Sequence, residues 1–202
     1  MSMSEVVEIP APVQLNFTQR WNTYLAVVLA AVVLFLGLTM RRNTLSATQT
    51  FEDLEAGVRA QVPFGWLVDA KSDEYVFRAE DPDALPFKTM LQVSVMTVGP
   101  DATPNIVLDL LNMQRAPRFS TYREIARFDE TLRGDPAKRM IYAYTQDERN
   151  PFQASVPIVV QGVDVVVLRR GQAVIITYRE ERGDFEKNLG RFEDLLATVE
   201  IF

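Results

Sequence analysis

The sequence predicts an α+β domain behind one N-terminal transmembrane helix. From Trp21 to Met40 the chain carries no charged residue. From Phe51 onward, segments in which apolar and polar residues alternate are interrupted by two amphipathic helical segments. Short turns separate neighbouring β-type segments and favour antiparallel pairing. We therefore expect a mostly antiparallel sheet of about six or seven strands, flanked by helices in an α/β/α sandwich.

The apolar segment 21–40 is predicted to be a retained single-pass anchor. About 20 helical residues span about 30 Å, the thickness of the hydrocarbon core of a bilayer. A cleaved signal peptide would begin with a basic region and end in small residues, but two glutamates precede this segment and TMRRN follows it. A buried soluble helix would show a polar stripe, which LAVVLAAVVLFLGL lacks.

The two ends of this segment carry residues typical of a membrane interface. Trp21 and Tyr24 lie at one end, and Arg41 and Arg42 lie at the other. The positive-inside rule compares these two arginines with the single Arg20 on the opposite flank. A difference of one residue leaves the side of the extramembrane domain open.

The predicted domain organisation has four parts. These are an irregular N-terminal arm at 1–20, the transmembrane helix at 21–40, a linker at 41–50 and a folded domain at 51–202. The arm contains Pro10 and Pro12, and the linker includes the polar, uncharged stretch NTLSATQT.

The first half of the folded domain reads as three strands and a helix. The strands are expected at 58–63, 74–79 and 88–99. Thr103 and Pro104 are expected to cap and start the helix, and Pro117 ends it. Its apolar face is expected to consist of Ile106, Val107, Leu110, Leu111 and Met113 or Gln114.

The second half reads as four strands and a final helix. The strands are expected at 122–132, 138–146, 156–170 and 172–180, with turns at Gly134–Pro136 and at Arg170-Gly171. Asp184 is the expected N-cap of the last helix. The apolar face of that helix is expected to consist of Phe185, Leu189, Phe192, Leu195 and Leu196.

Composition excludes several classes of chemistry. The chain has no cysteine and no histidine, so thiol nucleophiles, disulfides, Cys/His zinc sites and Ser-His dyads are absent. Its net charge of −6 disfavours binding to a phosphate backbone, so we expect no nucleic-acid partner. The sequence contains no S-x-x-K, Walker or GxGxxG motif. We therefore predict no catalytic residues, cofactor or metal.

The folded domain resembles the PsbP/Mog1-like superfamily. The resemblance rests on the order of its elements and on VPFGW (62–66), LRGDPAKRMIYAY (132–144), VLRRGQAVIITYRE (167–180) and FEKNLGRFEDLLATVEIF (185–202). That superfamily includes an accessory subunit of the photosynthetic oxygen-evolving complex and a Ran-binding nuclear transport factor. The resemblance implies a non-catalytic interaction module. This chain differs in its membrane segment and its acidity, so no partner and no binding residue is carried over.

Two acidic pairs are candidate metal ligands. Asp81 with Asp83, and Asp147 with Glu148, could supply oxygen ligands to a hard cation, but Asp and Pro also favour turns for backbone reasons. We interpret both pairs as loop residues. The last pair, Glu180-Glu181, is expected to be solvated.

Two aromatic residues are candidates for contact with a partner. Trp66 could be an exposed anchor, although packing beneath the opening turn is the stronger alternative. Phe152, between Pro151 and Pro157, has no periodic reason to be buried.

These observations favour a non-catalytic accessory or assembly subunit of a larger membrane complex. By the resemblance, an energy-transducing complex of photosynthetic or respiratory electron transfer is the most attractive host. Its partners would be the lipid bilayer and other subunits. The alternatives are a free-standing anchored protein that binds a small ligand or peptide, which predicts a pocket between sheet and helix, and an enzyme that uses carboxylates alone.

Overall fold

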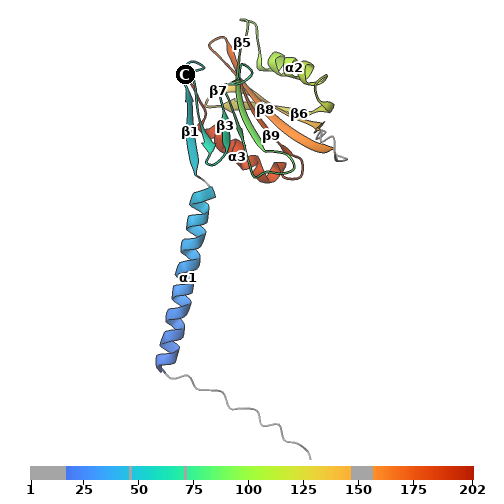
Figure 1. Ribbon diagram of the computed structural model, residues 1–202. Coiled ribbons are helices and arrows are strands. Elements are labelled where there is room, and N and C mark those ends of the chain that lie inside the picture. The colour runs from blue at the N-terminus through green and yellow to red at the C-terminus, as the bar shows by residue number, and fades with distance from the viewer. Residues whose placement is uncertain (1–16, 46, 71, 147–156) are drawn as a thin grey trace, which may run out of the picture. The chain divides into compact units, whose positions relative to one another are not determined.

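The computed structural model describes residues 17–45, 47–70, 72–146 and 157–202. It divides into two compact units, Met1–Ala47 and Thr48–Phe202. The first contains helix α1 (Phe17–Leu45), and the second contains α2 (Pro104–Arg115), α3 (Phe185–Thr198) and the strands (Figure 1). The strands are β1 (Thr48–Asp53), β2 (Val58–Pro63), β3 (Leu67–Asp69), β4 (Phe77–Glu80), β5 (Met90–Thr97), β6 (Ser120–Leu132), β7 (Asp135–Gln146), β8 (Ile158–Arg169), β9 (Gln172–Glu181) and β10 (Glu200–Ile201).

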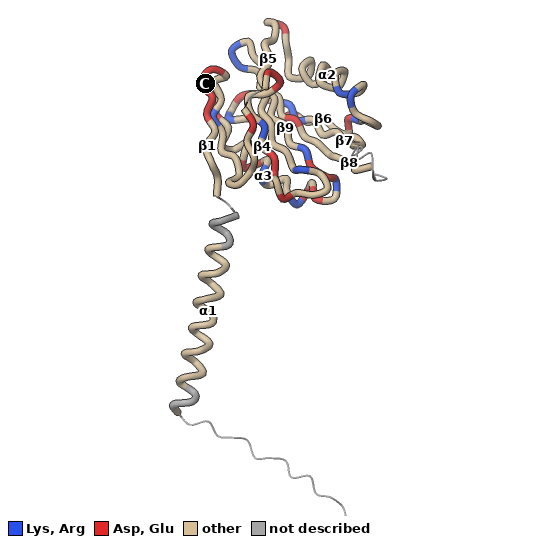
Figure 2. The backbone as a smooth tube through the Cα atoms, in the orientation of Figure 1, with Lys and Arg blue, Asp and Glu red and all other residues tan. Residues whose placement is uncertain are grey.

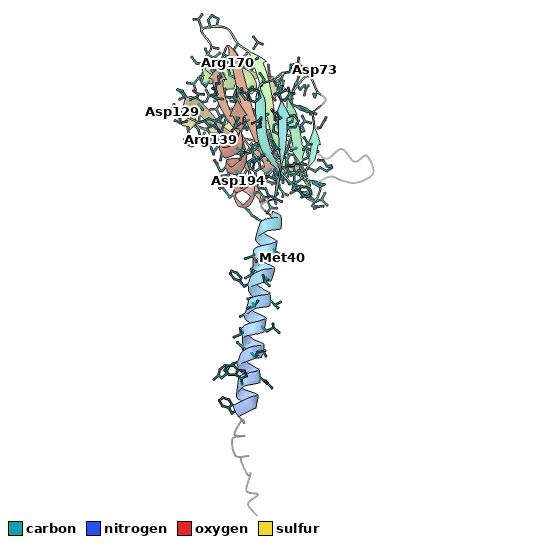
Figure 3. All side chains as sticks on the ribbon, turned by 90° about the vertical axis from the view of Figure 1, so that its left-hand side faces the viewer. Met40, Asp73, Asp129, Arg139, Arg170 and Asp194 are labelled. Carbon is teal, nitrogen blue, oxygen red and sulfur yellow. The ribbon has the colours of Figure 1, made fainter. Side chains whose placement is uncertain are left out.

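Helix α1 is long and apolar enough to cross a membrane. Its apolar stretch Trp21–Met40 has a mean hydropathy of 2.4, and none of it is buried. The side chains project from all sides of the helix (Figure 3). The stretch Trp21–Met40 carries no acidic or basic residue, whereas both kinds are spread over the second unit (Figure 2). A buried core helix, one of the three interpretations of this segment, is therefore wrong.

The predicted linker at 41–50 is largely taken up by regular structure. Helix α1 continues to Leu45, and β1 already begins at Thr48. The polar residues of β1 alternate between exposed and half-buried and pair antiparallel with β2, from Thr48 opposite Pro63 to Asp53 opposite Val58. The sequence of β1 has few apolar residues, because one side of this strand is exposed to solvent, and the strand was therefore not predicted.

Antiparallel pairing builds a sheet of seven strands, in the order β3-β4-β5-β9-β8-β7-β6. This confirms the predicted fold class. Each of the seven predicted strands overlaps an observed one, and the sequence did not show β1, β3 and β10. Strands β1, β2 and β10 form a separate three-stranded sheet.

Alternation along the strands gives the large sheet two buried faces. Val163, Val165 and Val167 of β8 pack in a cluster with α3 and β2, whereas Val166 packs in a second cluster with Val107 of α2. Helices α2 and α3 accordingly lie on opposite sides of the sheet (Figure 1). This is the expected layered arrangement, with the small sheet sharing the face covered by α3.

Two tight hairpins set the register of the four long strands. Arg133-Gly134 joins β6 to β7, and Arg170-Gly171 joins β8 to β9. All four residues have positive φ, between 51° and 90°. Two successive positive φ values characterise the type I′ turn, which matches the right-handed twist of the strands it joins. The first turn lies one residue before the predicted Gly134–Pro136.

The predicted apolar face of α3 is confirmed, and that of α2 is half wrong; Asp184 is the N-cap position of α3, as predicted, but its side chain makes no capping hydrogen bond. Phe185, Phe192, Leu195 and Leu196 of α3 are buried as expected. The Thr103 side chain caps α2 by accepting a hydrogen bond from the backbone N–H of Ile106. The buried residues of α2, however, are Val107, Leu108 and Arg115, and the expected core residues Ile106, Leu110 and Met113 are exposed.

Candidate functional site

The candidate site is a groove beside α2 on one face of the large sheet. Helix α2 contacts β7 and β8 and leaves part of the same face of β4, β5 and β9 uncovered. The groove has a volume of about 550 Å³, within the range typical of ligand pockets. Its lining combines four arginines with uncharged polar and apolar side chains: Arg78, Arg115, Arg118, Arg179, Gln92, Ser94, Gln114, Thr177, Val95, Met96, Leu111, Phe119 and Ile175, with Asp73 and Glu74 from the loop before β4.

A buried ion pair closes the groove beneath α2. Both terminal nitrogens of Arg115 donate to the carboxylate of Asp164 on β8, with Nη2 at 3.0 Å from Oδ1. Thr177 Oγ1 donates to the same Oδ1 at 2.7 Å, and the Tyr142 ring lies 4.5 Å from the guanidinium carbon. Burial lowers the pKa of Arg115, but the Asp164 carboxylate and the neighbouring Tyr142 and Tyr122 side chains together raise it by more, so the net direction is upward.

This ion pair explains why α2 turns an unexpected face to the sheet. Asp164 is fully buried on a valine-rich strand, and a buried carboxylate needs a partner. Arg115 lies seven residues, about two turns, after Leu108, so the two side chains share a face. That orientation leaves Ile106, Leu110 and Met113 pointing outward.

Arg179 is the most enclosed free cation of the groove. Its Nε donates to the Tyr142 hydroxyl at 3.1 Å, and its guanidinium carbon lies 5.4 Å from the centre of the Phe119 ring. Burial lowers the pKa of Arg179, while the Tyr142 and Tyr144 phenols raise it by more. Among the described residues, no carboxylate pairs with it.

The other two arginines of the groove also lack an acidic partner in the described part of the chain. Arg78 Nε donates to the amide oxygen of Gln92 at 3.1 Å, and its guanidinium carbon lies 4.3 Å from the Tyr75 ring. Arg118 is exposed just beyond the end of α2. Arg115 is neutralised by Asp164, so three uncompensated guanidinium groups remain along this surface.

A hydrogen-bonded network ties α2 to the edge strand β6. The Tyr122 hydroxyl donates to the Asn112 side-chain oxygen, and the Asn112 amide donates to Glu124. Arg127 donates to Glu124 at 2.9 Å and to Asp109 at 2.8 Å. These contacts fix the position of the helix over the sheet. They also leave its outer face free.

The outer face of α2 presents an apolar stripe to solvent. Ile106, Leu110 and Met113, here called the α2 stripe, are 55%, 37% and 74% exposed. The spacing of four and then three residues places them on one side of the helix. Apolar groups that gather at a surface mark sites of protein contact.

Of the two aromatic residues predicted to contact a partner, Trp66 and Phe152, the structure describes only Trp66. Trp66 is only 7% exposed and packs in the core, and the Arg191 guanidinium carbon lies 5.4 Å from its ring. Packing beneath the opening turn, the stronger of the two alternatives, is therefore confirmed for Trp66, and its side chain is not an exposed anchor. Phe152 lies outside the described residues.

The interfacial residues of the predicted anchor lie on α1. Trp21 and Tyr24 are exposed near the start of its apolar stretch. Arg41 and Arg42 fall within the last turns of the helix, and their side chains lie outside the described part of the structure.

The acidic pairs do not form metal sites in the regions that the structure describes, where no group of three or more Asp and Glu could hold an ion. Asp81 accepts the backbone N–H of Asp83 in a turn, as expected, and accepts Arg191 at 2.8 Å. Asp147 and Glu148 lie outside the described residues. Glu180 is 2% exposed, so its predicted solvation is wrong. Its carboxylate accepts hydrogen bonds from the Thr89 hydroxyl, the Asn188 amide and the backbone N–H of Glu181.

Sequence reasoning missed the arginine groove, although part of its signal was available. Gln92 and Ser94 alternate with valines on β5, and Thr177 and Arg179 occupy alternate positions on β9. Such alternation indicates a sheet face that is not fully covered. The neighbourhood of β5 and β9 and the reach of Arg118 depend on tertiary structure, so no local pattern could show them.

Comparison with known proteins supports the fold alone. No family model matches the chain, and no curated protein matches it in sequence. Among solved structures, cyanobacterial PsbP (CyanoP) from Synechocystis sp. PCC 6803 aligns with a TM-score of 0.56 at 12% identity, over 78% of this chain and 94% of that one. LpqN of Mycobacterium tuberculosis, which is involved in cell envelope biogenesis, aligns with a TM-score of 0.52 at 13% identity, over 77% and 90%. The Ran-binding protein Mog1p of Saccharomyces cerevisiae gives 0.48 at 8% identity, over 77% and 95%. The alignments above a TM-score of 0.5 thus show a PsbP-like fold, as the sequence motifs predicted, and the chain also has a helix long enough to span a membrane.

Proposed function

We propose that this protein is a membrane-anchored, non-catalytic accessory or assembly subunit of a larger membrane complex. Helix α1 holds the chain in the bilayer, and the folded domain binds another subunit through the α2 stripe. Following the resemblance, energy-transducing electron-transfer complexes are the first hosts to test. A free-standing anchored protein that binds a small ligand is the alternative.

The anchor part of the proposal rests on the physical character of α1. Leaving a helix of this length and composition in water would expose its apolar surface at a cost of about 25 cal/mol per Å². A cleaved signal sequence would share the apolar stretch, but the flanking residues do not match its basic start or its small-residue end. Retention in the membrane gives this surface an apolar environment.

The observation that carries the binding part is the α2 stripe. Three apolar side chains stand exposed on a helix whose opposite side is tied to the sheet by a buried ion pair. The helix is therefore held rigidly while its outer face remains free. Rigid apolar helix faces serve as anchors in helix-mediated recognition.

The proposal that the protein is not an enzyme follows from its side-chain chemistry. Without cysteine or histidine, catalysis would depend on carboxylates, lysine, tyrosine or serine. Glu180 is a buried carboxylate of the described chain, and hydrogen bonds from Thr89, Asn188 and its own strand engage it. Asp164 is paired with Arg115. These groups support the fold.

The test compares a stripe variant with a matched surface variant in native membranes. The stripe variant carries Ile106→Gln, Leu110→Gln and Met113→Gln. The control carries Leu54→Gln, Phe64→Gln and Leu85→Gln, three exposed apolar residues outside α2. Each tagged full-length chain is extracted in mild detergent, and the proteins that co-purify are quantified by mass spectrometry.

We expect the unaltered chain and the control to retain the same membrane subunits at a constant ratio. The stripe variant should lose them about tenfold or more, since buried apolar anchors contribute most of the energy at such interfaces. Equal recovery of the same subunits by the stripe variant would show that α2 is not the contact. Recovery of no subunits by the unaltered chain would contradict the proposed function itself.

A further inference from the structure

We propose that the groove between α2 and strands β4, β5 and β9 binds a small oxyanion, a carboxylate or phosphate group carried on an apolar body. The groove uses different residues from the α2 stripe. The inference therefore does not depend on the accessory-subunit proposal, and each can fail without the other.

The first argument is the local charge. The protein as a whole is acidic, with a net charge of −6, yet this one groove collects the uncompensated guanidinium groups of Arg78, Arg118 and Arg179. Guanidinium groups present a planar fork of donors that fits the two oxygens of a carboxylate or phosphate. An anion bound there would supply the partner that the described carboxylates do not.

The second argument is that Arg179 is already held in place. Its Nε is bonded to Tyr142, its guanidinium lies near the Phe119 ring, and it is only partly open to solvent. The terminal nitrogens are not engaged by a carboxylate of the described chain. A donor that is fixed before binding loses little conformational entropy when a ligand arrives. A partly enclosed donor is also screened less by salt than an exposed one.

The third argument is the apolar part of the lining. Met96, Leu111, Phe119 and Ile175 line the same groove as the arginines. A bare inorganic ion would leave these side chains without contact. A ligand with an apolar body would cover them and gain from the burial. The lining therefore favours an amphipathic anion.

Two acidic residues argue against a polyanion as the ligand. Asp73 and Glu74 line the groove on the loop before β4. A phosphate backbone running along the surface would meet these carboxylates and the acidic remainder of the domain. A ligand with a single anionic group can contact the arginines and avoid them. The groove therefore fits a small molecule.

The test uses two probes that share a ring and differ in the anionic group, phenyl phosphate and phenylacetate. The full chain is embedded in nanodiscs of phosphatidylcholine, which carries no net charge, and binding is measured by isothermal titration with empty nanodiscs as the blank. Phenylacetamide, which has the ring without the charge, is the ligand control. We expect saturable binding of at least one anion at one site, weakened by added salt, and no binding of the amide.

Three variants locate the binding site. Arg118→Gln removes an exposed cation without touching the core, and Arg179→Gln removes the enclosed one. Arg123→Gln, on β6, is the control, because Arg123 is exposed, lies outside the groove and has no ion pair within the described chain. We expect each groove variant to weaken binding about tenfold or more, as loss of a charged hydrogen-bond partner does, and the control to match the unaltered chain.

The two probes and the variants distinguish a phosphate ligand, a carboxylate ligand and the absence of an anion site. Binding of phenyl phosphate alone would assign a phosphate ligand, and binding of phenylacetate alone would assign a carboxylate. Because Arg118 is exposed, its variant keeps the test valid even if Arg179→Gln fails to fold. Absence of saturable binding by either anion, or equal affinity in the Arg118→Gln and Arg123→Gln variants, would overturn the inference.

Discussion

At the scale of single residues, Asp164 decides how one side of the domain is built. Its carboxylate is fully buried in the middle of β8 and accepts hydrogen bonds from Arg115 and Thr177. Through Arg115 it sets the orientation of α2. Gly162, two residues earlier, makes room for the Tyr142 ring, since a Cβ at this position would lie 2.3 Å from Tyr142 Cζ. Tyr142 in turn contacts both Arg115 and Arg179.

Replacement of Asp164 by asparagine should strongly destabilise the domain. The change leaves the buried Arg115 guanidinium without a counter-charge, and breaking one side of a buried ion pair costs about 3–5 kcal/mol. Urea unfolding followed by circular dichroism measures the loss. The control is Asp129→Asn. The side chain of Asp129 is 90% exposed and pairs with Lys138 at the surface. This control should change the free energy of unfolding by less than about 1 kcal/mol. Equal effects of the two changes would contradict the account of Asp164.

At the scale of secondary-structure elements, the longer strands of the domain and the hairpin between β8 and β9 were predictable from the sequence, whereas β1, β3 and β10 were not. β8 is rich in valine, β9 contains the apolar run 173–176, and Arg170-Gly171 joins the two strands, a pattern typical of a buried hairpin. The apolar face of α3 was equally predictable, because Phe185, Phe192 and Leu195 recur with a helical period. These signals are local, so tertiary structure did not change them.

Helix α2 shows where such reasoning fails. Its sequence allows two apolar faces, one through Ile106, Leu110 and Met113 and the other through Val107, Leu108 and Leu111. The choice between them depends on the bond between Arg115 and Asp164, two residues that are 49 positions apart. No local pattern could reveal this pairing. The same holds for Glu180, whose burial depends on Thr89 and Asn188.

Two truncations on α2 test this orientation. Leu108→Ala should lower the free energy of unfolding by about 2–5 kcal/mol, because Leu108 is fully buried and its removal leaves a cavity. Met113→Ala should change it by less than about 0.5 kcal/mol, because Met113 is mostly exposed. Both are measured by urea unfolding. If Met113→Ala were the more damaging change, the helix would have to lie with its other face on the sheet.

At the scale of the whole molecule, buried tyrosines make the domain sensitive to alkali. Burial raises the pKa of Tyr144 to about 12 and that of Tyr122 to about 12, and it also raises the pKa of Tyr178. In the unfolded chain a tyrosine ionises near pH 10. Between about pH 10 and pH 12 the unfolded chain therefore binds fewer protons than the folded one, and the free energy of unfolding falls as the pH rises.

For Tyr144, which is almost fully buried, this linkage amounts to on the order of 2–3 kcal/mol across that window. Stability should be unaffected by these tyrosines below about pH 9 and should decline steadily above about pH 10. The measurement is the urea midpoint at successive pH values. Tyr144→Phe should make the decline shallower. A decline that is equally steep in that variant would exclude Tyr144 as a source.

The whole-molecule claim is that an apolar helix and a PsbP/Mog1-like domain together form a subunit of a membrane complex. Native-gel electrophoresis of gently extracted native membranes, with mass spectrometry of the band that contains this chain, tests it most directly. We predict that the chain, with α1 still attached, migrates in one large band together with other membrane subunits at a constant ratio. Migration alone, near the mass of a monomer, would contradict the account.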